Sequence, residues 1–149
     1  MSQQMLETSK VGPTLEQLTV GTAMHPGVVT CPVETPLPTV ARMMATYRIH
    51  AVIVFNEDSD DVAGADLWGV VSDLDLVKAA SAGEIGDRTA GGTAVTPVVT
   101  VERDETLARA VQLMSEHEVT HLVVVDPKQT RPIGVLSTLD VARTVAESA

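Results

Sequence analysis

The sequence has few aromatic residues and little cysteine. Tyr47, Phe55 and Trp68 are the only Tyr, Phe and Trp, although 44% of the 149 residues are hydrophobic. The core must therefore consist mainly of aliphatic side chains. Cys31 is the single cysteine, which excludes a disulfide within the chain and is typical of a reducing compartment.

Basic residues are also scarce. Ten Lys and Arg stand against twenty Asp and Glu, which gives a formal net charge of −10. A surface of this charge repels phosphate backbones, so we expect no nucleic-acid partner. No apolar run approaches the roughly 20 residues needed to span a bilayer. The first 18 residues lack the basic start and apolar stretch of a secretory signal. We therefore expect a cytoplasmic protein without a membrane partner.

One short stretch occurs twice. GVVSDLDL at 69–76 and GVLSTLDV at 134–141 are identical at five of eight positions. The tripeptide VVT at 28–30 recurs at 98–100, which is 70 positions later, whereas the two octets are 65 positions apart. The difference falls in the loop 56–68, which is longer than its counterpart, and surface loops tolerate such insertions. The chain therefore contains an internal repeat.

Both copies predict the same order of elements. Apolar residues at Leu107, Ala110, Val111 and Met114 follow helical spacing, and β-branched runs before each polar loop indicate buried strands. The order is β-α-β-β-α twice, with elements at 28–30, 36–49, 51–55, 68–71 and 72–83 and at 98–101, 107–119, 122–125, 133–136 and 137–148.

A unit of about 60 residues buries too little surface to be stable alone. The predicted fold class is therefore α/β (α+β), with two β-α-β-β-α repeats packed sheet against sheet about a pseudo-two-fold axis. We expect an N-terminal extension at 1–17, repeat 1 at 18–82, a linker at 83–92 and repeat 2 at 93–146, together forming one module. The linker region is rich in Gly, Ala and Thr and has little helical pattern.

A serine precedes an aspartate by three residues in both copies, as Ser72 and Asp75 and as Ser137 and Asp140. One interpretation is a capping box at the start of each last helix, although Glu or Gln is more usual in the acidic position. A second interpretation adds a ligand. A helix N-terminus accepts phosphate, and a carboxylate in its first turn can bind the hydroxyls of a ribose. The residues alone leave both interpretations open.

The two copies resemble a tandem pair of CBS domains, also called a Bateman module, over roughly residues 18–146. The family marker is Gly, two hydrophobic residues, Ser or Thr, two variable residues and Asp, and both octets contain it. The resemblance implies that Asp75 and Asp140 bind ribose hydroxyls and that Ser72 and Ser137 lie near the phosphate. It also implies that four backbone positions line the adenine slots: Val29, Thr30, Val99 and Thr100.

The sequence departs from the family pattern before the central strands. Family members that bind phosphorylated adenosines often have a His–Arg pair there, whereas this chain has His50 followed by Ala, and Thr120 followed by His121. Both clefts are therefore expected to be short of cations. Lys78 and Arg143, one turn after each motif aspartate, either compensate or are solvated surface charges. This shortage argues against triphosphates more than against adenosine or AMP.

No metal site and no catalytic site are expected. His117 and His121 are four apart, but one belongs to a helix end and the other to a strand, and no third ligand is near. Neither Ser72 nor Ser137 has an evident general base, so the chain is not expected to be an enzyme. For Cys31 we favour a buried position in the core.

We therefore expect a ligand sensor that needs no cofactor and binds AMP, ADP, ATP or S-adenosylmethionine between its repeats. It would signal by a change of shape or association. Its expected partners are a second copy of the chain, suggested by soft residues such as Met43, Met44, Ala45 and Met114, and an effector protein. The alternative is an assembly module with vestigial clefts that acts through protein contacts.

Overall fold

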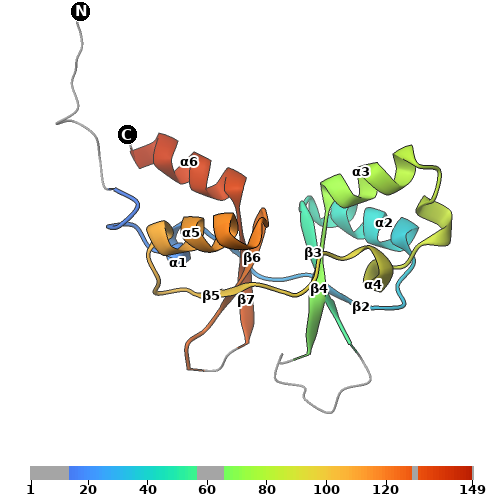
Figure 1. Ribbon diagram of the computed structural model, residues 1–149, viewed down its shortest axis with the longest axis horizontal. Helices are drawn as coiled ribbons and strands as arrows, with labels where there is room; N and C mark the ends of the chain where they lie inside the picture. Colours follow the sequence, from blue (N-terminus) through green and yellow to red (C-terminus); the bar gives the residue numbers. More distant parts are fainter. Residues whose placement is uncertain (1–13, 57–65, 129–130, 149) are drawn as a thin grey trace, which may run out of the picture.

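The computed structural model describes residues 14–56, 66–128 and 131–148, and it consists of two similar halves placed side by side (Figure 1). Both halves follow the predicted β-α-β-β-α order. The first half contains β2 (Thr30–Pro32), α2 (Leu37–Tyr47), β3 (Ala51–Phe55), β4 (Leu67–Ser72) and α3 (Asp73–Ser81). The second contains β5 (Thr100–Glu102), α5 (Leu107–His117), β6 (His121–Val125), β7 (Pro132–Ser137) and α6 (Thr138–Ser148).

The two sheets have matching topology. In each half the short first strand runs parallel to the central strand, and the central strand pairs antiparallel with the last one. The registers also match, because Thr30 pairs with Ile53 and Thr100 pairs with Val123, 70 positions later. Each motif serine lies opposite the first residue of a central strand, so the strand pairing fixes where the following helix begins.

The two halves meet through their sheets. Ile53, Val70, Val123 and Val125 form a buried apolar cluster between them, apart from the cores beneath the helices of each half. The middle residues of β3 and β6 are completely buried, as expected for strands covered on both faces. The mixed fold with two sheets packed together, predicted from the repeat, is confirmed.

The segments that lead into each repeat are exchanged between the halves. Before the first repeat lie α1 (Val20–Ala23) and β1 (His25–Pro26), but they belong spatially to the second half. Val20 is buried in the second core, and β1 pairs antiparallel with β7. Conversely, Ala90 of α4 (Ala90–Thr93) is buried in the first core. Figure 1 shows the chain crossing between the halves after each of these segments.

The linker differs from the expectation of little helical structure. It contains η3 (Ile85–Asp87) and α4. The Thr89 hydroxyl caps α4 by accepting a hydrogen bond from the Gly92 N–H at 3.2 Å. One turn of helix is unstable alone, so burial of Ala90 and this cap must stabilise it, and neither leaves a periodic sequence signal.

A glycine in each last strand allows the exchanged segment to approach. A Cβ at position 134 would lie 2.6 Å from the His25 carbonyl oxygen, whereas one at position 86 would meet nothing within 4 Å. We expect Gly134→Ala to lower the free energy of unfolding by about 1–3 kcal/mol, because backbone must move. Urea denaturation measures the change, and Gly86→Ala is the matched control. Equal stability of the two variants would show that the β1–β7 contact is unimportant.

Candidate functional site

Each Ser–Asp pair forms a complete capping box. At the start of α6, Asp140 Oδ2 accepts hydrogen bonds from the Ser137 N–H at 2.8 Å and from its hydroxyl at 2.9 Å. The Asp140 N–H donates to Ser137 Oγ at 3.1 Å. Ser72 and Asp75 make the same three bonds at the start of α3, at 2.8, 3.0 and 3.3 Å. The aspartates therefore reach back as well as the more usual glutamate does.

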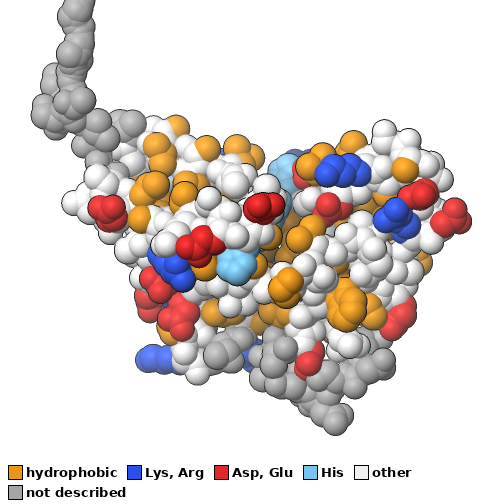
Figure 2. Space-filling view, viewed as in Figure 1, with side chains coloured by type: hydrophobic (Ala, Val, Ile, Leu, Met, Phe, Trp, Pro, Cys, Tyr) orange, Lys and Arg blue, Asp and Glu red, His pale blue; other side chains and the backbone are white. Residues whose placement is uncertain are grey.

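One cleft of about 500 Å³ lies beside Asp140, and we call it the Asp140 cleft. Both halves contribute to its wall. Residues 27–29 and 47–51 come from the first half, and the second half contributes the exchanged strand β1 (His25–Pro26) together with His121, Val135, Ser137, Leu139, Asp140 and Arg143. Its size is within the usual range for small-molecule sites, about 300–1,000 Å³. Figure 2 shows a notch between the two halves with histidine side chains at its edge.

The corresponding cleft beside Asp75, the Asp75 cleft, is much smaller, at about 110 Å³. Its wall consists of Val70, Ser72, Leu74 and Asp75 with residues 118–121 and Val95, Pro97, Val98 and Val99. This volume is below the usual range for small-molecule sites, about 300–1,000 Å³. The repeat therefore produces two related clefts of very different size.

The structure brings most of the expected site residues to these clefts. Val29, His50, Ser137, Asp140 and Arg143 line the Asp140 cleft, Ser72, Asp75, Val99 and Thr120 line the Asp75 cleft, and His121 lines both. Thr30 and Lys78 line neither cleft. Thr100 instead lines a separate cavity of about 590 Å³ near β5 and α5.

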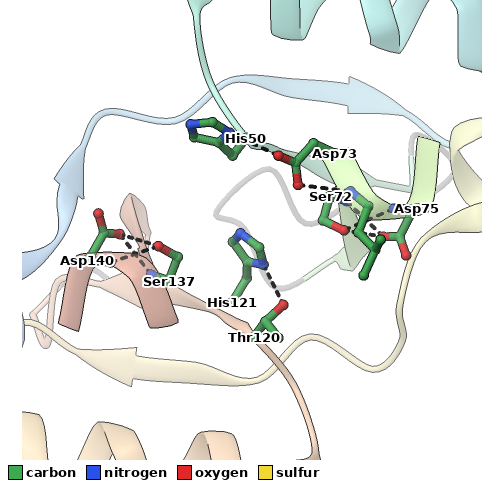
Figure 3. A network of polar contacts seen from close by, with 9 residues as sticks. His50, Ser72, Asp73, Asp75, Thr120, His121, Ser137 and Asp140 are labelled. Carbon is green, nitrogen blue, oxygen red and sulfur yellow. Dashed lines mark hydrogen bonds and ion pairs between the residues drawn. The ribbon is translucent and has the colours of Figure 1, made fainter. Parts of the chain in front are cut away.

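Two histidines lie between the Ser–Asp pairs (Figure 3). His50 Nδ1 is 3.0 Å from Asp73 Oδ2, and both side chains are exposed. His121 Nδ1 is 2.9 Å from the Thr120 hydroxyl. Burial lowers the pKa of His121, although the negative charges of Asp73, Asp140 and Asp75 act in the opposite direction. The nearby His50 lowers it further, so the neutral imidazole is favoured where the two clefts meet.

Sequence reasoning missed several charged or polar residues of the clefts. His25 and Arg48 line the Asp140 cleft, and Glu118 lines the Asp75 cleft. Arg48 and Glu118 are 70 positions apart, and both have left-handed backbone, with φ of 55° and 54°. Each follows a helix, at a turn that leads into a central strand. The offset of the repeat would have identified this pair, but the orientation of their side chains depends on the turn.

The remaining candidate residue, Cys31, has a structural role. Cys31 is buried in the first core as expected, and burial raises its pKa, so the thiol stays protonated.

In the described part of the chain, no three His, Cys, Asp or Glu side chains gather in a way that could hold a metal ion. No described helix combines the length and the apolar character needed to cross a membrane.

His121 should make stability depend on pH. Its pKa is lower in the folded chain than the usual value of about 6.5, so the unfolded chain binds more protons below that pH. The stability contribution is therefore complete above pH 6.5 and is lost as the pH falls through the folded-state pKa. Urea denaturation between about pH 7.5 and 5.5 should show a smaller loss for His121→Gln than for the wild type. His117→Gln, at an exposed histidine, is the control. Parallel curves for wild type and His121→Gln would contradict the assignment.

Comparisons with known proteins match this arrangement. The CBS domain family model matches residues 20–82 and again residues 92–147. An uncharacterised protein of Methanopyrus kandleri is 28% identical over 130 residues, which cover 85% of this chain. The match covers 62% of that protein, so the chain spans less than two thirds of its length.

Two solved structures share the fold. The CBS domain pair of protein MJ0100, in complex with 5′-methylthioadenosine and S-adenosyl-L-methionine, has a TM-score of 0.72 at 18% identity over 88% of this chain and 98% of that one. The hexameric CBS-CP12 protein from bloom-forming cyanobacteria has a TM-score of 0.72 at 19% identity over 84% and 69%. Because the family model matches both halves, this chain belongs to the CBS domain family as a tandem pair.

Proposed function

We propose that the chain is a non-catalytic regulatory module that binds an adenosine-containing ligand between its repeats. The Asp140 cleft carries this proposal, because it is a ligand-sized cavity with a capped helix N-terminus in its wall. The first turn of α6 offers N–H groups and the positive end of a helix dipole to a phosphate. A similar domain pair binds two adenosyl compounds, which supports the choice of ligand.

The chemistry of the wall suits the other parts of a nucleotide. The Asp140 side chain, only 11% exposed, is fixed by Ser137, and its carboxylate can accept hydrogen bonds from ribose hydroxyls. Val28, Val29 and Val135 supply apolar surface for a base. None of these groups is arranged for catalysis: in the described residues, the Ser137 hydroxyl bonds to Asp140 and not to a histidine.

A ligand in the Asp140 cleft would link the two halves. The wall combines β1 and the start of β3 with the start of α6, so contacts to one ligand would come from both repeats. Binding would stabilise one relative placement of the halves, and a partner that contacts both could detect it. In this proposal the signal is a change of shape or of association.

The surface for association differs from the one expected from sequence. Met44 and Met114 are core residues, so they cannot form an outer patch. Exposed apolar side chains lie instead on α3 and α6, as Leu74, Val77, Leu139 and Val145. The two helices occupy the same edge of the molecule in Figure 1. This surface, and the hexameric state of one structural neighbour, support self-association.

The alternative function is an assembly module whose clefts are vestigial. The small volume of the Asp75 cleft favours this alternative for one half of the molecule. Nucleotide binding distinguishes the two proposals, because an assembly module would show no stabilisation by adenine compounds.

AMP should stabilise the folded chain through Asp140. At a hundredfold excess over the dissociation constant, one site adds about 2.7 kcal/mol, which raises the melting temperature by roughly 5–10 °C for a domain of this size. Asp140→Asn should lose most of this shift, because the amide can still cap α6 but presents no charge to the ribose. Differential scanning fluorimetry measures both values.

Asp87→Asn, at an exposed carboxylate on η3, should keep the full shift. If Asp140 serves only as a cap, Asp140→Asn will melt at a lower temperature and yet respond normally to AMP. If millimolar AMP, ADP, ATP and S-adenosylmethionine all leave the wild-type melt unchanged, the sensor proposal is wrong and the assembly module is favoured.

The chain should be a dimer in solution. Light scattering at micromolar concentration should give about twice the chain mass of 15.7 kDa. Val77→Lys combined with Val145→Lys should shift the mass toward the monomer, because charges would be buried in the contact. Both sites are exposed helix positions, so circular dichroism should be unchanged. A monomer mass across the whole wild-type concentration series would contradict the proposal.

A further inference from the structure

The repeat provides an internal comparison between the two clefts. The Asp140 cleft has two arginines in its wall, Arg48 and Arg143, and one carboxylate, Asp140. Among the described residues, the wall of the Asp75 cleft has two carboxylates, Asp75 and Glu118, and no Lys or Arg. The two walls are built from corresponding segments, so their opposite charge comes from individual residues and not from the fold.

The difference in charge between the two cleft walls is clearest at the left-handed turns. Arg48 follows α2 and Glu118 follows α5, with nearly equal φ angles. Both side chains line a cleft, one on each side of the pseudo-two-fold axis. Within the described residues, the Arg48 guanidinium has no hydrogen-bond or ion-pair partner. This free cation stands out in a chain with twice as many acidic as basic residues.

A second difference lies one turn into the last helices. Arg143 lines the Asp140 cleft and donates to Asp140 Oδ1 at 3.2 Å, with its side chain 54% exposed. A guanidinium has five N–H donors, so most remain for a ligand. The corresponding residue, Lys78, lines neither cleft. Two further positions have an imidazole only in the Asp140 cleft. His25 and His50 line that cleft, and the residues 70 positions later, Val95 and Thr120, line the Asp75 cleft.

We infer that the Asp140 cleft alone binds ligand, and that the ligand is a phosphorylated adenosine, bound once per chain. The inference rests on the proposed function and deepens it. Arg48 and Arg143 belong to the same wall as Ser137, where the N-terminus of α6 offers its N–H groups. Arginine suits phosphate because its planar fork donates two parallel hydrogen bonds. Of the two residues expected to compensate for a shortage of cations, Arg143 lies in the wall of this cleft and Lys78 in neither wall, and Arg48 adds a cation that was not expected.

The Asp75 cleft cannot serve in the same way. Its volume of about 110 Å³ is far below that of the Asp140 cleft, and Glu118 and Asp75 repel a phosphate. The net charge of −10 also disfavours anions elsewhere on the surface. One nucleotide per chain follows from size and charge together.

Three probes with the same adenosine group test the inference by isothermal titration calorimetry on the full chain. AMP carries negative charge, adenosine is neutral, and S-adenosyl-L-methionine carries a positive sulfonium. We expect one AMP per chain, bound at least about tenfold more tightly than adenosine, with S-adenosyl-L-methionine no tighter than adenosine. AMP affinity should fall as salt is raised from 50 to 300 mM, and adenosine affinity should change little.

Substitutions at the two arginines locate the phosphate. Arg48→Gln and Arg143→Gln should each weaken AMP about tenfold or more and adenosine less than about threefold, because charged hydrogen bonds are lost only with the phosphate. Lys78→Gln removes a cation at the corresponding position outside the clefts and is the matched control. It should leave AMP binding within about twofold of the wild type.

The outcomes distinguish a failure of this inference from a failure of the proposed function. Three results would overturn the inference: two AMP bound per chain, equal affinity for AMP and adenosine, or equal losses of AMP affinity in Lys78→Gln and Arg48→Gln. Each of them would still agree with the proposed binding of an adenosine-containing ligand. If none of the three probes binds the wild type at millimolar concentration, the proposed function itself fails and the inference fails with it.

Discussion

Contact between the two sheets is the constraint on which the rest of the structure depends. The central strands are covered on both faces, by helices on one side and by the other sheet on the second, and Val52–Val54 and Leu122–Val124 are fully buried. A single repeat would expose one of those faces to water, and each buried Val or Leu side chain contributes about 1.5–3 kcal/mol. The exchanged segments α1 and α4 strengthen the same dependence, because each half completes the other's core.

The site is a consequence of this packing. Each last helix begins where a strand ends at the junction of the halves, so its capped N-terminus faces the other repeat. The exchanged strand β1 pairs with β7 and adds His25 to the wall of the Asp140 cleft. A ligand there would contact elements far apart in sequence, so its binding would affect how the two halves are placed relative to each other. His121 lies at the centre, in the walls of both clefts.

Much of the fold could be predicted from sequence because each pattern occurs in both repeats. The element order, the buried strands and the Ser–Asp caps all depend on local spacing. The exchange of α1 and α4 between the halves, the unequal clefts and the position of Arg48 in a cleft wall could not be predicted, because they depend on which surfaces meet after folding. Met44 and Met114 were misjudged as surface residues for the same reason: their helices bury that face. Residues 1–13 of the expected N-terminal extension lie outside the described residues, while Leu15 and Leu18 pack on the second core.

The doubled motif and the divergent walls carry different information. Ser and Asp start a helix equally well with or without a ligand, and both boxes are complete in clefts of very different size. Their repetition is therefore evidence for the fold first. In the described part of the chain, the side chains of Arg48 and Glu118 make no comparable bond to helix or strand. Each residue ends a helix through its backbone N–H in the same left-handed turn, and only the side chain differs. Because the backbone tolerates either residue there, the choice of charge is free to serve a ligand. The proposed choice of cleft and of ligand therefore rests on the positions that folding constrains least.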